Sequence, residues 1–200
     1  MLQEMMAMTV YLMRHGEPTY RDTVALGLPG MGAELGQLTP EGIQQAEEAA
    51  KDPRIQGTDL IVSSPYPRAL QTAAIVSRQI DRPLEVAVGL HEWLPRTDYA
   101  AASHADIKES WHEYMRNAGV HTPQDRFPDW ETHASMRKRA REAILPYLAR
   151  TDLETLLIVC HGGIMRALTD QPSLPKIRFC EIMELTPEMI RALNTQESEG

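Results

Sequence analysis

Short apolar runs alternate along the chain with stretches in which apolar residues recur at helical spacing. Thr9–Met13, Asp59–Ser63 and Thr155–Cys160 are compact and almost continuously apolar, as strands buried on both faces are. We expect two further strands, at Leu84–Val88 and Glu181–Leu185. This alternation is typical of an α/β fold, and we expect these strands to form a mostly parallel sheet.

The helical stretches are marked by their first residues and by their apolar faces. Thr39-Pro40-Glu41 has the residue types of an N-cap, a first-turn proline and a first-turn acid, which predicts the start of a helix. Three further helices are predicted, at Arg68–Gln79, Asp106–Asn117 and Thr132–Arg150. The residues expected to face inward are Ile43, Ala46 and Ala50; Leu70, Ala73, Ala74 and Ile75; Ile107, Trp111 and Met115; and Met136, Ala140, Ile144 and Leu148.

The length of the chain suits one sizeable domain with a real core. Its 200 residues contain neither internal repeats nor low-complexity segments. We interpret residues 1–8 as an N-terminal extension and residues 9–200 as a single domain. Within that domain, residues 16–37 are predicted to form a long loop, and residues 94–126 are expected to be a lid-like insertion that contains the helix at Asp106–Asn117.

Composition and charge narrow the classes of function. The formal net charge of −8 argues against a nucleic-acid binder, although a pocket of opposite local charge remains compatible with it. No apolar stretch is long enough to span a membrane, and the first residues do not have the pattern of a signal peptide. The two cysteines form neither a disulfide framework nor a zinc motif. We therefore expect a cytoplasmic protein without a metal or a cofactor, and leave a homodimer open.

Polar residues with chemical potential follow directly after the predicted strands. These are Arg14-His15-Gly16-Glu17, Ser63-Ser64 with Arg68, His91-Glu92, and His161-Gly162-Gly163. In open α/β sheets, ligands bind outside the carboxyl ends of the strands. If the strands are parallel neighbours, two histidines, two arginines and a glutamate meet in one crevice.

This set of residues suits phosphoryl transfer. Arg14 and Arg68 can clamp a phosphate through their planar guanidinium groups, and neighbouring cations disfavour protonation of His15 and His161. A neutral histidine can act as a covalent nucleophile. Glu92 could protonate the leaving oxygen and then take a proton from the attacking water. The sequence therefore predicts a phosphate-transfer enzyme with His15 as its nucleophile.

Four ordered segments resemble the motifs of the histidine phosphatase superfamily, also called the phosphoglycerate mutase-like family. They are residues 12–17 (LMRHGE), 38–46 (LTPEGIQQA), 63–73 (SSPYPRALQTA) and 159–163 (VCHGG). The resemblance implies a three-layer α/β/α sandwich in which His15 is phosphorylated. It implies that Arg14, Arg68 and His161, with Gly162, form the phosphate pocket, and it places the acid/base at Glu92. Glu17 matches an acid of the motif and is expected to orient its neighbours.

The leading function is hydrolysis of a small phosphate ester, and two alternatives stay open. The first is a cofactor-dependent phosphoglycerate-type mutase. The family's mutases grip a carboxylated substrate with a segment that here is replaced by Pro18-Thr19-Tyr20 and residues 30–34 (GMGAE), which disfavours this alternative. The second is a non-catalytic phosphate-binding module, which the complete set of pocket residues disfavours.

Several other residues have a chemical and a structural interpretation. Cys160 and His161 are adjacent on a strand, so their side chains are expected to diverge and Cys160 to serve in packing. Ser63 and Ser64 lack the surroundings of a nucleophilic serine, so hydrogen bonding at the strand end is expected. A metal site at His104, Asp106, Glu109 and His112 is disfavoured because the spacing is only partly helical. Arg96, Tyr99, Arg126 and Trp130 could shape the substrate lid, but each is expected rather to serve in packing or to lie at the surface.

Overall fold

The computed structural model describes residues 8–28, 30–100 and 103–195. Its strands are β1 (Thr9–Arg14), β2 (Pro18–Thr19), β3 (Gln37–Leu38), β4 (Leu60–Ser63), β5 (Leu84–Val86), β6 (Thr155–Cys160) and β7 (Ile182–Leu185). Its α-helices are α1 (Arg21–Ala25), α2 (Pro40–Ala49), α3 (Pro67–Ile80), α4 (His104–Arg116), α5 (His133–Leu148), α6 (Gly162–Thr169) and α7 (Pro187–Thr195). Short 3-10 helices occur at Gly30–Leu35 (η1), Pro53–Ile55 (η2) and Val88–Leu90 (η3).

Five strands form the central sheet in the order β5-β4-β6-β1-β7. β1, β4, β5 and β6 run parallel, while β7 pairs antiparallel with β1 at one edge. In register, Arg14 lies opposite Cys160, and Ser63 lies opposite Val159. The carboxyl ends of β4, β6 and β1 therefore meet at one edge of the sheet, as the sequence predicted.

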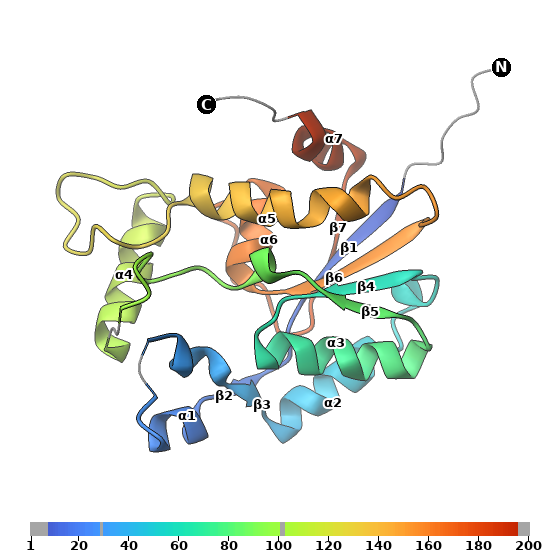
Figure 1. Ribbon diagram of the computed structural model, residues 1–200, viewed down its shortest axis with the longest axis horizontal. Helices are drawn as coiled ribbons and strands as arrows, with labels where there is room; N and C mark the ends of the chain where they lie inside the picture. The colour runs from blue at the N-terminus through green and yellow to red at the C-terminus, as the bar shows by residue number, and fades with distance from the viewer. Residues whose placement is uncertain (1–7, 29, 101–102, 196–200) are drawn as a thin grey trace.

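Helices cover both faces of this sheet, so the molecule has three layers. In Figure 1, α2 and α3 lie on one side, and α5 and α6 on the other. The strand β6 serves both sides: Leu156 and Ile158 belong to the apolar cluster under α5 and α6, whereas Leu157 and Val159 belong to the cluster under α2 and α3. A strand buried on both faces explains the continuous apolar run at 155–160. The predicted α/β/α sandwich is confirmed.

The predicted helix at Thr39 begins as its residue types indicate. The Thr39 side chain accepts a hydrogen bond from the Gly42 N–H, and Pro40 occupies the first turn of α2. Its buried face is narrower than predicted, since Ala46 and Ala50 are buried but Ile43 is 42% exposed. The inward face of α3 is also shifted: Ala74 is exposed, and the buried residues are Arg68, Ala69, Thr72, Ala73 and Val76.

Other elements differ from the prediction in their boundaries or were not predicted. The third strand ends at Val86, and Val88–Leu90 forms η3. The expected loop at 16–37 contains the small β2–β3 pair, α1 and η1. The helix α6 was not predicted, because it is buried along its whole length and so shows no polar face. The helix α7 was not predicted either.

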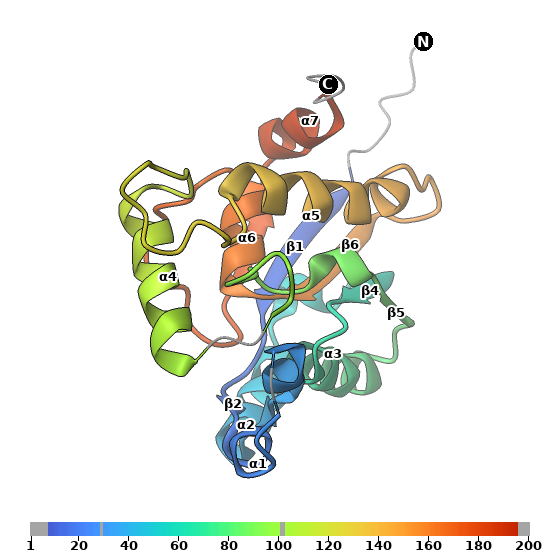
Figure 2. The same ribbon diagram turned by 60° about the vertical axis from the view of Figure 1, so that its left-hand side comes forward.

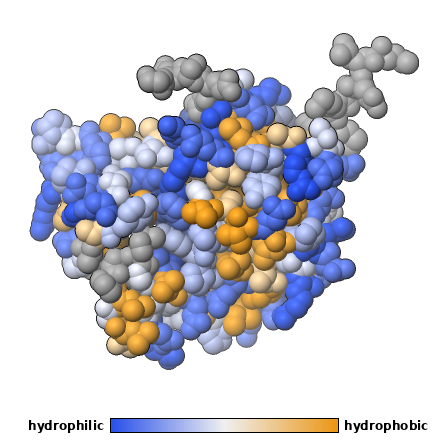
Figure 3. Space-filling view, viewed as in Figure 1, coloured by the Kyte–Doolittle hydropathy of each residue, from blue (hydrophilic) through white to orange (hydrophobic). Residues whose placement is uncertain are grey.

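The α4 helix lies beyond the end of the sheet, on the side where the α1–η1 segment also lies (Figures 1 and 2). The α1–η1 segment carries the exposed apolar side chains Val24, Leu26 and Leu35, and an apolar group is visible over this region at the lower left of Figure 3. Val86 and Val88 are exposed at the β5 edge of the sheet. The homodimer stays a prediction, as does the division into an N-terminal extension and a domain with an insertion.

Candidate active site

His15 lies at the carboxyl end of β1, inside the molecule. Its side chain is 3% exposed, and its backbone N–H donates to the Cys160 carbonyl at 3.0 Å. Its Nδ1 lies 2.7 Å from the Gly16 carbonyl oxygen. Because a carbonyl oxygen can only accept, Nδ1 carries the proton and Nε2 has the free lone pair. Burial, together with the charge of Arg68, lowers the pKa of His15 to about 3, so the ring is neutral at ordinary pH.

Close backbone packing fixes the loop that carries His15. A Cβ on Gly16 would come within 2.5 Å of the Gly42 carbonyl oxygen, and a Cβ on Gly42 within 2.2 Å of the Glu17 carbonyl oxygen. Only glycines allow these two segments to approach so closely. The Gly16 N–H donates to Thr72 Oγ1 at 3.0 Å, and Thr39 Oγ1 donates to the Glu17 carboxylate at 2.8 Å. Glu17 therefore contacts the N-cap residue of α2, and the orienting role expected for it stays a prediction.

Two arginines hold their guanidinium groups beside His15. Arg14 Nη1 donates to the Ile177 carbonyl at 2.6 Å, and Arg68 Nη2 donates to the Glu34 carboxylate at 2.8 Å. Among the described residues, neither Arg14 Nε nor Arg68 Nε has a hydrogen-bond partner, although both atoms are buried. An unpaired buried donor is costly, so two anchored cations with free donors are suited to an anion.

His161 follows the last residue of β6, and its imidazole ring packs against the ring of His15. The two imidazole rings are 5.1 Å apart between centroids, and His161 is fully buried. Its Nε2 lies 2.7 Å from Ser64 Oγ, and its buried Nδ1 has no partner within the described part of the chain. Ser64 Oγ also accepts from the Tyr66 N–H at 3.3 Å. If the Ser64 hydroxyl donates to Nε2, the proton of His161 resides on Nδ1, where it can be donated to a ligand.

Burial holds the pKa of His161 well below its ordinary value, and the charge of Arg68 acts in the same direction.

Ser63 and Ser64 form hydrogen bonds at the end of β4, as expected. Ser63 Oγ donates to the Ser64 carbonyl at 2.9 Å. Cys160 belongs to the core under α5 and α6, and burial raises its pKa, which leaves it a neutral packing residue.

Glu92 reaches the site from the segment after η3. Its Oε1 accepts hydrogen bonds from the Trp93 N–H at 2.8 Å and from the Gly163 N–H at 3.1 Å. A Cβ on Gly163 would lie 2.3 Å from this oxygen, so the second glycine of the HGG motif makes room for the carboxyl group. Burial raises the pKa of Glu92, and this effect outweighs the two hydrogen bonds and the charge of Arg68, which lower it.

A cavity of about 730 Å³ joins these groups. Five of the predicted site residues line it, namely Arg14, His15, Arg68, Glu92 and Gly162. His161 does not line the cavity, but its ring packs against the ring of His15. The structure therefore brings together all the residues that the sequence singled out for the site.

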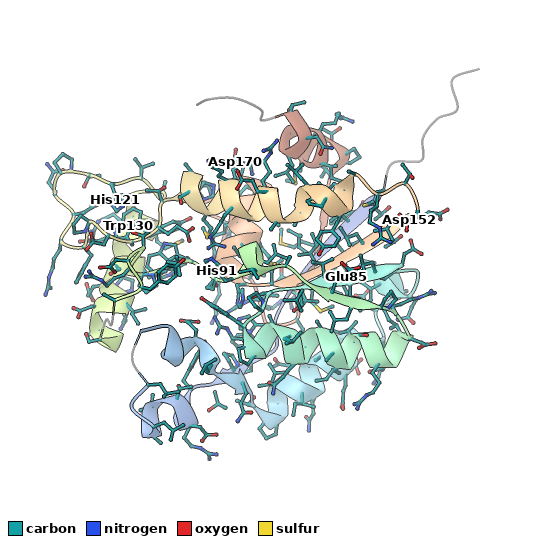
Figure 4. The ribbon with its side chains drawn as sticks, in the orientation of Figure 1. Glu85, His91, His121, Trp130, Asp152 and Asp170 are labelled. Atoms are coloured by element: carbon teal, nitrogen blue, oxygen red, sulfur yellow. The ribbon has the colours of Figure 1, made fainter. Side chains whose placement is uncertain are left out.

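The four residues considered for the substrate lid have packing or surface positions, as was expected of them. Arg96 pairs with Asp98 on the surface, and Trp130 is buried in the aromatic core beside α4; His121 and Trp130 lie together in Figure 4, with ring centroids 3.8 Å apart. Neither these two lid candidates nor Tyr99 and Arg126 line the cavity. Ile107, Trp111 and Met115 line it instead, so the inward face of α4 is directed at the site.

Among the side chains that the structure describes, which exclude His104, no group could hold a metal ion.

Several cavity residues escaped the sequence reasoning. Tyr20 and Glu34 come from the segment treated as a loop, and residues 173–177 and 179 come from the irregular segment between α6 and β7. Neither segment has a periodic pattern. The signal that was available for Glu34 was its position in the segment that replaces the substrate grip of the mutases.

The family to which this architecture belongs follows from comparison with known proteins. A model of the histidine phosphatase superfamily (branch 1) matches residues 10–194. The chain therefore belongs to this superfamily and is an enzyme of the histidine phosphatase class. Within the described ranges, no helix has the length and apolar character needed to cross a lipid bilayer.

Its relatives carry names of both phosphatases and mutases. "Putative phosphoserine phosphatase 2" of Hydrogenobacter thermophilus is 27% identical over 159 residues, which are 80% of this chain and 75% of the relative. "Probable phosphoglycerate mutase GpmB" of Proteus mirabilis is 28% identical and covers 76% of this chain and 69% of its own length. The solved structure of a mycobacterial glucosyl-3-phosphoglycerate phosphatase has a TM-score of 0.68 at 22% identity, covering 90% of this chain and 91% of that one. The last likeness is one of fold.

Proposed function

We propose that this enzyme is a phosphomonoesterase that hydrolyses a phosphate ester through a phosphohistidine on His15. The observation that carries the proposal is a neutral His15 whose Nδ1 is held by the Gly16 carbonyl, beside two arginine Nε donors that have no partner among the described residues. This arrangement leaves Nε2 as the nucleophilic atom and provides positive charge for a phosphoryl group.

The first half-reaction transfers the phosphoryl group to the enzyme. His15 Nε2 attacks phosphorus, and the bond between phosphorus and the ester oxygen breaks in line with it. The carboxyl group of Glu92 gives its proton to the leaving oxygen, a role for which its raised pKa suits it. The imidazole becomes cationic as the bond forms, and the hydrogen bond from Nδ1 to the Gly16 carbonyl stabilises that charge.

The second half-reaction returns the enzyme to its starting state. A water molecule attacks phosphorus and gives a proton to the Glu92 carboxylate, and the bond between phosphorus and Nε2 breaks. Inorganic phosphate leaves, while His15 is neutral and Glu92 is protonated again. Arg14 Nε and Arg68 Nε would donate to the phosphoryl oxygens throughout, which lowers the barrier of both steps, while His161 packs against the His15 ring.

Hydrolysis is favoured over phosphoglycerate mutase activity by the segment that replaces the mutases' substrate grip. In this chain Glu34, a carboxylate, lines the cavity from that segment. The test is incubation with p-nitrophenyl phosphate and, separately, with 3-phosphoglycerate plus bisphosphoglycerate. We expect release of inorganic phosphate from the first. Isomerisation of the second without phosphate release would refute hydrolysis.

A further inference from the structure

Arg14, His15 and Arg68 form one end of the cavity, here called the phosphate end. The other part of the cavity has mainly apolar walls. The side chains that line this part are Trp93, Ile107, Trp111, Met115, Leu174 and Ile177. They come from three separate segments, namely the stretch after η3, the helix α4, and the irregular segment before β7. An apolar chamber that adjoins a cationic end is suited to a ligand with one anionic and one apolar part.

The aromatic part of this wall is fixed in place by packing. Trp111 stacks on Tyr114 with ring centroids 5.0 Å apart and an angle of 7°, and it meets Trp93 edge-on at 5.2 Å. Tyr114 is fully buried, and Trp93 Nε1 donates to the Glu131 carbonyl at 2.8 Å. The wall is therefore present before a ligand binds, so little conformational entropy is lost on binding.

Arg166 lines this part of the cavity and donates hydrogen bonds to three backbone carbonyls. Arg166 donates from Nη1 to Gly162, from Nε to Leu174 and from Nη2 to Pro175, at 2.9 to 3.1 Å. These bonds hold the 174–175 turn against α6 and direct three of the five N–H groups of Arg166 to the backbone. Lys176 also lines the cavity, but its side chain is exposed, where water and salt screen its charge.

The Glu34 carboxylate adds negative charge near the phosphate end. Glu34 accepts a hydrogen bond from Arg68 Nη2 at 2.8 Å, and its charge contributes to the raised pKa of Glu92. A carboxylate on the substrate, close to the ester, would lie near the negative charge of Glu34, and Arg68 is already paired with that residue. Like charges placed close together disfavour such a ligand.

From these observations we infer that the cavity selects phosphate monoesters whose alcohol part is apolar and carries no carboxylate beside the ester. The inference rests on the proposed hydrolysis only in its use of turnover as a readout. It sets this chain apart from relatives named for phosphoserine or glucosyl-3-phosphoglycerate. The apolar wall binds the apolar part of the ester, and the charge of Glu34 disfavours esters that carry a carboxylate.

Two matched pairs of esters separate these contributions. The first pair is 2-phenylethyl phosphate and ethyl phosphate, which differ by the phenyl ring and have similarly poor leaving groups. The second is glycerol 3-phosphate and 3-phosphoglycerate, which differ by a carboxylate. We expect kcat/KM to favour 2-phenylethyl phosphate by about 10- to 100-fold, because the ring leaves water. We expect kcat/KM to favour glycerol 3-phosphate by at least about tenfold.

Two variants serve as controls for each other. Trp111→Ala should lower the first ratio by about fivefold or more and leave the second unchanged. Glu34→Gln should lower the preference for glycerol 3-phosphate by about fivefold and leave the first ratio unchanged. Any effect of Glu34→Gln on Arg68 cancels in the ratio, because both esters of a pair use the same phosphate end. Ile107→Ala replaces Trp111→Ala if circular dichroism shows that the latter is unfolded.

The outcomes separate this inference from the proposed function. Equal kcat/KM values within both pairs would overturn the inference, even if every ester is hydrolysed. If no ester, including p-nitrophenyl phosphate, is hydrolysed, the proposed function fails. In that case, calorimetric binding of 2-phenylethylphosphonate and ethylphosphonate still decides the inference: tighter binding of the former by tenfold supports it, and equal binding overturns it.

Discussion

The two ends of the cavity are built in different ways. At the phosphate end, Arg14, His15 and His161 follow directly from strands of the central sheet, and hydrogen bonds to backbone carbonyls or to Ser64 fix them. At the other end, apolar side chains come from α4 and from irregular segments. The phosphate end therefore has the rigidity that phosphoryl transfer requires, whereas the other end can differ between relatives without disturbing the chemistry.

This difference has a consequence that mutagenesis can test. A change at the phosphate end should slow esters with similar leaving groups alike, because each ester presents the same phosphoryl group. A change at the apolar end should alter the ranking of esters. The variants below address the phosphate end and are ordered by the size of the expected effect.

Arg68→Lys should lower kcat/KM by about 10²- to 10³-fold for every ester. Lysine keeps the charge but loses the planar fork and the free Nε donor beside His15. Steady-state kinetics on the ester pairs named above measure the effect. Arg191→Lys, at an exposed arginine paired with Glu188, is the matched control and should keep full activity. A loss confined to one ester would contradict the separation of the two ends.

Glu92→Gln should slow alkyl esters by about 10²-fold and p-nitrophenyl phosphate only slightly, because a good leaving group needs no proton. The proton donor is active when protonated, so kcat/KM of the wild type should fall as pH rises through the raised pKa of Glu92. This fall should be absent in the variant. Glu85→Gln, at the β5 position labelled in Figure 4, is the control. Equal slowing of all esters would point to another acid.

The pH profile also bears on His15. Since its pKa is lowered to about 3, its lone pair is available at every pH above that value. We therefore expect no loss of activity between pH 7 and pH 5 from protonation of His15. A loss in this interval that persists in Glu92→Gln, on a substrate whose own titration has been corrected for, would contradict a neutral His15.

Ser64→Ala should have the smallest effect, about fivefold in kcat, because it removes one hydrogen bond of about 1 kcal/mol. Ser64 acts through His161 and is a positioning residue. Nitrogen NMR of His161 should show the proton on Nδ1 in the wild type and a mixture of tautomers in the variant. Ser63→Ala is the matched control, since the Ser63 hydroxyl donates to the Ser64 carbonyl and not to His161. An unchanged tautomer in Ser64→Ala would refute this role.

The phosphate end could be predicted from sequence because the sheet determines it. β6 matches the predicted run Thr155–Cys160 residue for residue, and parallel neighbours bring the residues after each strand to one edge. Glu92 was found through its resemblance to a motif, and the Gly163 N–H shows what holds it. Local pattern and global topology agree at this end of the cavity.

The apolar end could not be predicted, because periodicity does not say what a helix face contacts. Ile107, Trp111 and Met115 were expected to face inward, and they do face away from bulk solvent, but toward the cavity. Glu34 and Leu174 lie in segments without periodicity, where only long-range contacts such as those of Arg68 and Arg166 set their position. The sequence therefore left the substrate open.

The central claim, that His15 accepts the phosphoryl group, is tested most directly by trapping the phosphoenzyme. The measurement is rapid acid-free quenching of the wild type and of His15→Ala during turnover of a radiolabelled ester. We expect a phosphoenzyme in the wild type that is stable to base and labile to acid, none in His15→Ala, and a loss of kcat of about 10⁴-fold or more in that variant. A labelled His15→Ala protein with normal turnover would contradict the account.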